Sequence, residues 1–406
     1  TVTLAGVIDS SNDDITFGAI TLATATTLDT NATDTTGDII IGAVTGANNN
    51  LTLLTTTTSG SADNTFNGDI NLGTGALDVT GDVVLGANVS ITATASSGTG
   101  IRFRDKVDAD SASSNDRTLT LTSGTASTTI FSDNVGASQA LAGLTITQSN
   151  ATSFSGSVDV SDSSSGTITL TDTTDDANIT FSGAVTADSF TTAAQGYDIV
   201  FNADATFANA VTFQNTGTLD LGNATSDTFT FNGGVTENTG GTVTIDGAIV
   251  SSNDAISFGN INLGQNLSVT SAGGAISIGT ISAASGSQDI SITSSGGSAN
   301  TASVGAIGGN GRINTIAITG SSSVTLNGNI TTDNNSGNSV TITGTTINTG
   351  AITIDTDNSS NDGAINLVGS VAGGNNNLVL NSGTAEITLS GTAFNLGSGS
   401  LTTTGD

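Results

Sequence analysis

The sequence predicts an all-β protein folded as a parallel β-helix (β-solenoid), and three observations support this prediction. Strong helix formers other than Ala are scarce among the 406 residues, whereas Thr, Ser, Asn, Asp and Gly, which weaken helices, dominate. Short runs alternate polar and apolar residues, as strands with one buried face do. Segments of the sequence also recur along the chain, which is typical of repeat architectures.

The alternating runs are the predicted strands. Clear examples are residues 118–122, 167–171 and 242–245, in which Thr alternates with Leu, Ile or Val. Clusters of Gly, Asn, Asp and Ser separate the runs, as at 46–50 and 359–363, and these residues suit tight turns and left-handed backbone. Strands of four to six residues are therefore expected from one end of the chain to the other.

The repeats indicate which all-β architecture the strands form. Residues 1–22 match residues 242–263 without a gap at 14 of 22 positions, and residues 46–53 recur as 373–380. The tetrapeptide Ser-Ser-Asn-Asp occurs at 10–13, 113–116, 251–254 and 359–362. These matches place short units of about 20–27 residues inside a longer, degenerate repeat.

Phenylalanine spacing gives the length of one unit. Phe154, Phe181 and Phe201 are separated by 27 and then 20 residues, and Phe231, Phe258 and Ile278 repeat that spacing. If each unit is one coil, neighbouring coils place Phe or Ile on Phe in the interior and Asn on Asn in the turns.

Two architectures accommodate such repeats: a string of immunoglobulin-like sandwiches, or a solenoid. Sandwiches need about 100 residues each and are joined by linkers. No linker or change of composition interrupts this chain, and Pro and Trp are absent. A unit of about 20–27 residues cannot bury a core alone but can when stacked. We therefore expect residues 1–406 to form one continuous solenoid, with a loop or irregular coil at 101–117.

The composition excludes several functions. Without Cys or His the chain has no thiolate or imidazole metal ligand, no Ser–His–Asp or Cys–His nucleophile and no disulfide. Five basic against 35 acidic residues give a net charge of −30, which argues against nucleic-acid binding. No apolar run approaches the roughly 18–20 residues of a transmembrane helix. We expect no enzyme activity, no cofactor and no metal site.

Four of the five basic residues form one cluster, the candidate binding site: Arg102, Arg104, Lys106 and Arg117. Arg102 and Arg104 share one strand face, with Phe103 on the other. The cluster could contact an anion, a glycan or the acidic surface of a neighbouring subunit. The alternative is local pairing with Asp105, Asp108, Asp110 and Asp116, in exposed ion pairs of little energetic value.

Other polar patterns give weaker indications. The aspartates Asp172, Asp175 and Asp176, and likewise Asp355, Asp357 and Asp362, could bind Ca²⁺, but neither set has a known calcium-loop spacing. The doublets 13–14 and 175–176 raise the question of a polysaccharide-cleaving enzyme, yet adjacent strand residues point to opposite faces. Thr-x-Thr pairs raise ice binding, but their spacing is irregular, and Thr favours the outer face of a strand anyway.

The two ends of the chain resemble interior sequence. Residues 395–406 match residues 71–82 at eight of twelve positions, and residues 1–22 match 242–263. Neither end is expected to be a cap, although a solenoid leaves unpaired backbone at each open end. The chain is either a segment of a longer one, or a subunit that stacks end to end on its copies.

The pattern resembles the repeat regions of large secreted bacterial adhesins of the filamentous-haemagglutinin and autotransporter type. The segments that carry the resemblance are FNGDINLG at 66–73, VGASQALAGLTITQSNATSFSGSV at 135–158, ITFSGAVT at 179–186 and ISFGNINL at 256–263. The resemblance implies an extracellular, right-handed parallel β-helix used as a stalk or fibre at a bacterial cell surface.

The leading hypothesis is a non-enzymatic structural protein of a cell-surface filament, whose partner is a second copy of itself. The alternative is an adhesin stalk that binds a glycan or a host surface through the basic cluster. A polysaccharide-degrading β-helix enzyme is a distant third.

Overall fold

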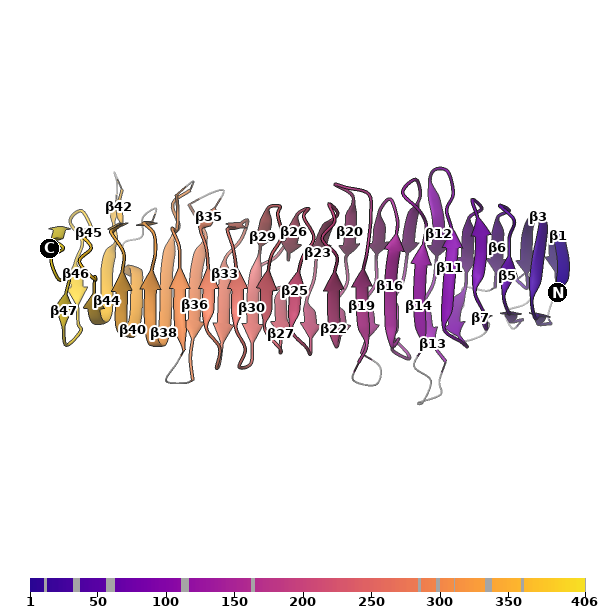
Figure 1. The fold of residues 1–406 in the computed structure, drawn as a ribbon, viewed down its shortest axis with the longest axis horizontal. Coiled ribbons are helices and arrows are strands. Elements are labelled where there is room, and N and C mark those ends of the chain that lie inside the picture. Colours follow the sequence, from indigo (N-terminus) through magenta and orange to yellow (C-terminus); the bar gives the residue numbers. More distant parts are fainter. Residues whose placement is uncertain are drawn as a thin grey trace. The chain divides into compact units, whose positions relative to one another are not determined.

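The fold is described from a computed structural model of the 406-residue chain. The described residues are 1–10, 13–31, 37–55, 63–110, 117–161, 165–283, 286–296, 300–309, 311–332, 338–358 and 361–405. They contain strands and turns but no helix, and they fall into two compact units (Figure 1). Unit 1 comprises residues 1–205 and 214–218, and unit 2 comprises residues 206–213 and 219–406.

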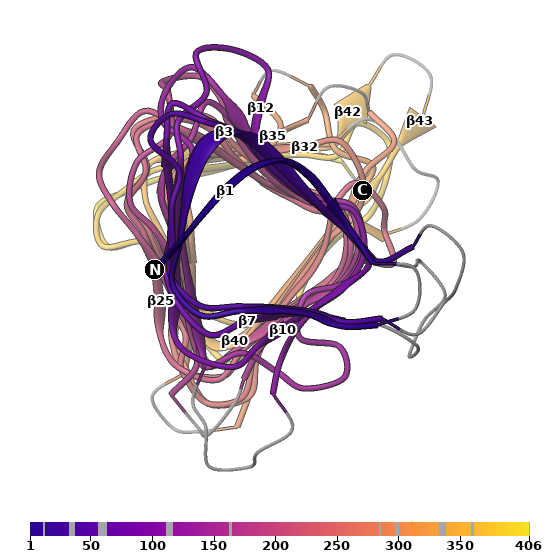
Figure 2. The ribbon, with the colours of Figure 1, turned by 90° about the vertical axis from the view of Figure 1, so that its right-hand side faces the viewer.

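Unit 1 is a stack of three-sided coils, and each side is a ladder of parallel strands (Figure 2). We call the sides A, B and C in chain order. Side A contains the first halves of β1 (Val2–Asp9) and β3 (Ile20–Asp29), then β5 (Val44–Thr45), β8 (Ile70–Gly73), β11 (Val89–Ala93), β14 (Thr118–Thr122), β16 (Gly143–Gln148), β19 (Thr167–Leu170) and β22 (Ser189–Thr192). Side B contains the second halves of β1 and β3, then β6 (Leu51–Leu54), β9 (Leu77–Thr80), β12 (Thr99–Phe103), β15 (Thr128–Phe131), β17 (Thr152–Phe154), β20 (Asn178–Phe181) and β23 (Asp198–Phe201). Side C contains β2 (Ile15–Phe17), β4 (Ile39–Ile41), β7 (Asp63–Phe66), β10 (Asp82–Leu85), β13 (Val107–Ala109), β18 (Val158–Val160) and β21 (Val185–Ala187).

Unit 2 is built in the same way, and we call its sides D, E and F. Side D contains β25 (Val211–Phe213), β28 (Val235–Glu237), β31 (Ile256–Phe258), β34 (Ile276–Ile278), β37 (Thr301–Val304), the second halves of β38 (Thr315–Leu326), β40 (Asn338–Thr349) and β44 (Ala364–Ala372), and β47 (Phe394–Asn395). Side E contains β26 (Leu219–Leu221), β29 (Val243–Ile245), β32 (Ile261–Leu263), β35 (Ile281–Ala283), β39 (Ile330–Thr331), β41 (Ile352–Asp355), β45 (Leu378–Asn381) and β48 (Leu401–Thr404). Side F contains β27 (Thr228–Phe231), β30 (Gly247–Ser251), β33 (Leu267–Ser271), β36 (Asp289–Ser294), the first halves of β38, β40 and β44, and β46 (Ile387–Leu389). β24 (Ala205–Phe207) crosses the boundary between the two units in sequence.

The ladders confirm the predicted parallel β-helix. Every strand pair within the two stacks is parallel; the described exception is a small antiparallel hairpin of β42 (Asp357–Asn358) and β43 (Asn361–Asp362). With the N-terminus nearest the viewer, the first coils of unit 1 run clockwise as they recede, so these coils are right-handed (Figure 2). Right-handed crossovers are the usual connection between parallel strands. Ladder partners lie 18 residues apart at Leu4 and Leu22 and 30 apart at Ile91 and Leu121, a wider range than the predicted 20–27.

The alternating runs place their apolar residues inward, as predicted. Leu119 and Leu121 of β14 are fully buried, and the Thr residues between them lie on the outer face. Five Phe side chains of side B form one stack, with ring centroids 4.7–4.9 Å apart, the spacing of paired strands. They are Phe103, Phe131, Phe154, Phe181 and Phe201.

Two expectations about stacking were wrong. Phe231 lies on side F and Phe258 on side D, so their 27-residue spacing does not place them on each other, although Phe258 does pair with Ile278. In the turn at 46–50 Asn does not stack on Asn. Instead the Oδ1 atoms of Asn48 and Asn50 accept hydrogen bonds from the backbone N–H groups of Thr74 and Ala76 in the next coil, at 3.1 and 2.9 Å.

This bond between coils recurs with Asp and Asn throughout both units. In each case a side-chain oxygen at a corner accepts the backbone N–H of a residue in the following coil, at 2.5–3.1 Å. The acceptors are Asp14, Asp38, Asp69, Asn88, Asn134, Asp198, Asp246, Asn260, Asn266 and Asn329. We call this contact the corner bond. It satisfies a donor that a turn would otherwise leave without a protein partner.

Residues 101–117 are only partly described. β12 and β13 lie in the ladders of sides B and C, and each pairs with a strand of the preceding coil. Residues 111–116 lie outside the described residues, as do 11–12 and 359–360 of the other Ser-Ser-Asn-Asp segments.

Candidate binding surface around Arg102

The basic cluster of the sequence is spread over all three sides of unit 1. Arg102 belongs to β12 and Arg104 follows it on side B, with the buried Phe103 between them, as predicted. Lys106 comes just before β13 on side C, and Arg117 just before β14 on side A. The fold therefore brings Arg102 and Arg104 together and distributes Lys106 and Arg117 around the coil.

Arg104 forms a two-pronged ion pair with Asp78 of the preceding coil. Its Nε and Nη2 atoms each donate to one carboxylate oxygen at 2.8 Å. This bond raises the pKa of the Arg104 guanidinium, and both side chains are exposed enough for solvent to screen the pair. Asp78 was not among the partners expected from the sequence, because it lies 26 residues away, one coil earlier.

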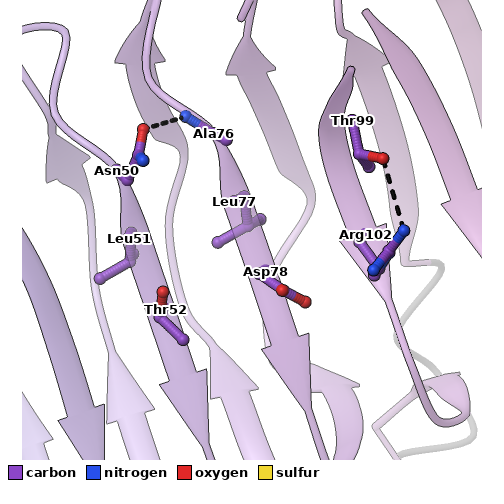
Figure 3. Close-up of a pocket in the computed structure, with 8 residues that line it drawn as sticks. All are labelled: Asn50, Leu51, Thr52, Ala76, Leu77, Asp78, Thr99 and Arg102. Atoms are coloured by element: carbon purple, nitrogen blue, oxygen red, sulfur yellow. Dashed lines mark hydrogen bonds between the residues drawn. The ribbon is translucent and has the colours of Figure 1, made fainter.

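Arg102 is different, because none of the ion pairs among the described residues involves it. Its Nη2 atom donates to Thr99 Oγ1 at 3.5 Å, a weak contact that leaves most of the guanidinium donors available (Figure 3). The side chain lies in a groove of about 230 Å³ on side B. The groove is lined by Asn50, Leu51, Thr52, Ala76, Leu77, Asp78, Thr99 and Arg102. Hydroxyl, carboxamide, carboxylate and guanidinium groups thus converge on one small depression.

Lys106 continues a column of stacked carboxylates on side C. Asp14, Asp38, Asp63 and Asp82 occupy equivalent positions in four successive coils, and Lys106, next to Val107, occupies that position in the fifth. The backbone N–H of Lys106 also donates to Asp82 Oδ1 at 3.4 Å. The ammonium group therefore lies at the end of a row of like charges.

The column shifts two pKa values. Burial raises the pKa of Asp63, and the charges of Asp38, Asp82 and Asp108 raise it further. Burial also raises the pKa of Asp82, but there the charge of Lys106 opposes the increase. Asp63, Asp82, Lys106, Asp108 and Asp110 contribute to a shallow groove of about 470 Å³.

Arg117 shows the local pairing expected as the alternative. Its Nε and Nη2 atoms donate to the two oxygens of Asp110 at 3.2 and 2.6 Å. Two other expected partners bond to backbone instead: Asp105 accepts from the N–H of Gly81, and Asp108 from that of Ser138. Asp116 lies outside the described residues.

Arg312, the fifth cation, clamps separate segments of unit 2. It donates to the backbone oxygens of Thr332, Asp355 and Asp357 and forms an ion pair with the Asp355 carboxylate at 3.4 Å. The sequence gave no sign of this role because the partners lie 20–45 residues downstream.

The aspartates considered for Ca²⁺ bond to protein donors. Asp355 and Asp357 accept from Asn381 Nδ2 at 3.0 and 3.3 Å, and Asp172 accepts from Gln148 Nε2 at 3.1 Å. Asp362 accepts from the N–H and hydroxyl of Thr384, and these bonds lower its pKa. In the described part of the chain no group of three or more His, Cys, Asp or Glu side chains is arranged to hold a metal ion.

The described residues form no helix that is long and apolar enough to span a membrane. Comparison with known proteins adds no identity. No protein family, no curated protein and no solved structure matches the sequence.

Proposed function

We propose that the chain is a non-enzymatic structural protein of an extracellular fibre at a bacterial cell surface. The observation that carries the proposal is the corner bond. Asp and Asn side chains, the most abundant groups able to bind a ligand or move a proton, bond to the backbone of the next coil. Their use between coils favours a mechanical role.

The cations support the same proposal. Arg104, Arg117 and Arg312 each bridge residues that are distant in sequence or belong to neighbouring coils. In a stack whose units contact only their neighbours, stability grows with each interface, so bonds of this kind hold the coils in register. Outward Thr, Ser and Asp residues keep the surface polar, and the net charge of −30 favours solubility.

Immunogold electron microscopy tests this function. Antibodies raised against the purified chain should label filaments on intact source cells, and a strain lacking the gene should lose both the label and the filaments. Label confined to the cell interior, or unchanged filaments in the deletion strain, would contradict a fibre role.

A second function, an adhesin stalk, is favoured by one observation: the unsaturated guanidinium of Arg102 in its groove (Figure 3). Such a group, beside Asn50, Thr52 and Thr99, suits a glycan with hydroxyl and carboxylate groups. Arg104 and Lys106 act there only through their pairing with Asp78 and Asp82.

Cell- and glycan-binding assays with charge-reversed variants test the adhesin function. Arg102→Glu should reduce binding at least tenfold, whereas the matched control Arg117→Glu, on side A, should leave it unchanged. Equal losses in both variants would show that overall charge, and not the groove, governs binding.

A further inference from the structure

The first and last coils expose side chains that every other coil buries. Val2, on side A, faces inward by its ladder register but is 49% exposed, whereas its partner Ile20 is 1% exposed. In the last coil Leu389, Phe394 and Leu401 lie on sides F, D and E and are 39–40% exposed. Their partners Leu367, Val371 and Leu378 are at most 3% exposed.

The backbone shows the same one-sidedness. β1 pairs with β3 and β2 pairs with β4, and at the other end β46 and β47 pair with β44 and β48 pairs with β45. Among the described residues no strand covers the other edge of these five. Such edges are templates for further strand pairing.

Sequences nearly the same as both ends are covered inside the chain. The counterpart of 1–22 is 242–263, where β26, β27 and β28 lie on the edges that β1 and β2 leave open. The counterpart of 395–406 is 71–82, where β11 and β12 lie on the edges that β47 and β48 leave open. A coil of this same type is therefore what each end fits.

The sides of the two ends also correspond. The turn at 46–50 joins side A to side B, and its repeat at 373–377 joins side D to side E. The first coil thus offers strands in the order A, B, C, and the last coil offers the matching D, E and F. Each end presents one strand edge per side.

We propose that a second copy of the chain docks its first coil on the last coil of the first copy, in register. The first half of β1 adds to β47, the second half to β48, and β2 adds to β46. Because the strands are parallel, the two ends are different surfaces. The contact is therefore heterologous, head to tail, and open to repetition. This proposal deepens the fibre function and rests on it.

The test blocks one end at a time in the 406-residue chain. Val2→Asp/Ile8→Asp places charge inward on the first coil, and Phe394→Asp/Leu401→Asp does so on the last. The matched control is Val7→Asp, on the outer face of β1, where the side chain is already 68% exposed. Association is measured by sedimentation velocity and electron microscopy, and folding by circular dichroism.

The wild type and Val7→Asp should form end-to-end polymers. Each blocked variant alone should be monomeric, and an equimolar mixture of the two should form a 1:1 complex that grows no further. Formation of that complex also shows that both variants are folded.

Polymers that persist in either blocked variant, or no complex in the mixture, would overturn the head-to-tail geometry but leave a fibre role standing. A wild type that stays monomeric overturns the docking itself. If surface filaments also lack the label, the proposed function fails with it.

Discussion

The choice of acidic residue follows from the reach of the corner bond. Asp and Asn have one methylene group, so their Oδ1 atom can accept an N–H from a strand about 4.8 Å away while the backbone turns the corner. Glu and Gln would overshoot with an extra rotatable bond. This accounts for a sequence that holds 35 acidic residues, of which only Glu237 and Glu386 are glutamate.

Replacement of Asp63 should stabilise unit 1. The pKa of Asp63 is raised by burial and by neighbouring carboxylates, so its charged form is disfavoured in the folded state. The stability it contributes is present below the ordinary pKa of 3.8 and is lost as the pH rises through the raised value. Asp63→Asn should therefore gain on the order of 0.5 kcal/mol at pH 7, after allowance for solvent screening, and the gain should vanish below pH 3.8.

Asp362 provides the opposite case for the same urea-unfolding experiments. Hydrogen bonds from Thr384 lower its pKa, so its contribution is present above the ordinary value of 3.8 and is lost as the pH falls through the lowered one. Asp362→Asn should destabilise unit 2 at pH 7 and have little effect in strong acid. Effects of the same sign in both variants would refute this account.

Tyr197, the one tyrosine, reports on the interior of unit 1. It is buried, its hydroxyl donates to the backbone oxygen of Leu170, and burial raises its pKa to about 12. Absorbance titration of the folded protein should give tyrosinate near pH 12, and in urea near the ordinary 10.0. Folded stability should fall as the pH rises from 10 towards 12. A folded-state midpoint near 10 would contradict burial of the hydroxyl.

At the scale of the element, the Phe stack of side B is the main aromatic core of unit 1. Phe181 contacts Phe154 and Phe201 face to face and Phe190 edge to face. Phe181→Ala should cost about 3–5 kcal/mol, and Phe394→Ala, half-exposed in the last coil, should cost much less. Hydrogen exchange should show faster opening in the coils around residue 181, and uniform protection would argue against a local core.

The corner bond gives a second prediction at this scale. Asn50→Ala removes the acceptor of the Ala76 N–H and should cost about 0.5–1.5 kcal/mol. Asn50→Asp keeps the acceptor and should be nearly neutral. Exchange of the Ala76 amide, measured by NMR, should accelerate only in the Ala variant.

Individual elements also show how far the sequence predicts the fold and the site. The spacing of Phe154, Phe181 and Phe201 predicted their stack because equal positions in successive coils lie on one side. It failed for Phe231 and Phe258, since coil length varies and a spacing does not identify a side. Likewise Asp78 escaped prediction as the partner of Arg104, because the register between coils decides which Asp lies opposite.

At the scale of the whole molecule, electrostatic repulsion opposes assembly. Copies with a net charge of −30 repel one another until salt screens the charge, with a Debye length of about 10 Å at 0.1 M and 3 Å at 1 M. End-to-end polymers should therefore lengthen at least tenfold between 0.01 and 1 M NaCl, as measured by light scattering. Polymers that shorten in salt would mean that ion pairs, and not apolar coils, join the copies.

The 22-residue repeat has a consequence for how such a surface changes. Residues 1–22 occupy sides A, B, C and A, whereas residues 242–263 occupy E, F, D and E. Relative to the shared Gly–Asn turn, the same segment is shifted by one side. Recombination that adds or removes one side's length would keep every ladder paired, because the interior requires only an inward apolar residue. It would also move each later outward residue to the next side, so a lineage could re-aim its surface stepwise at no cost to the core.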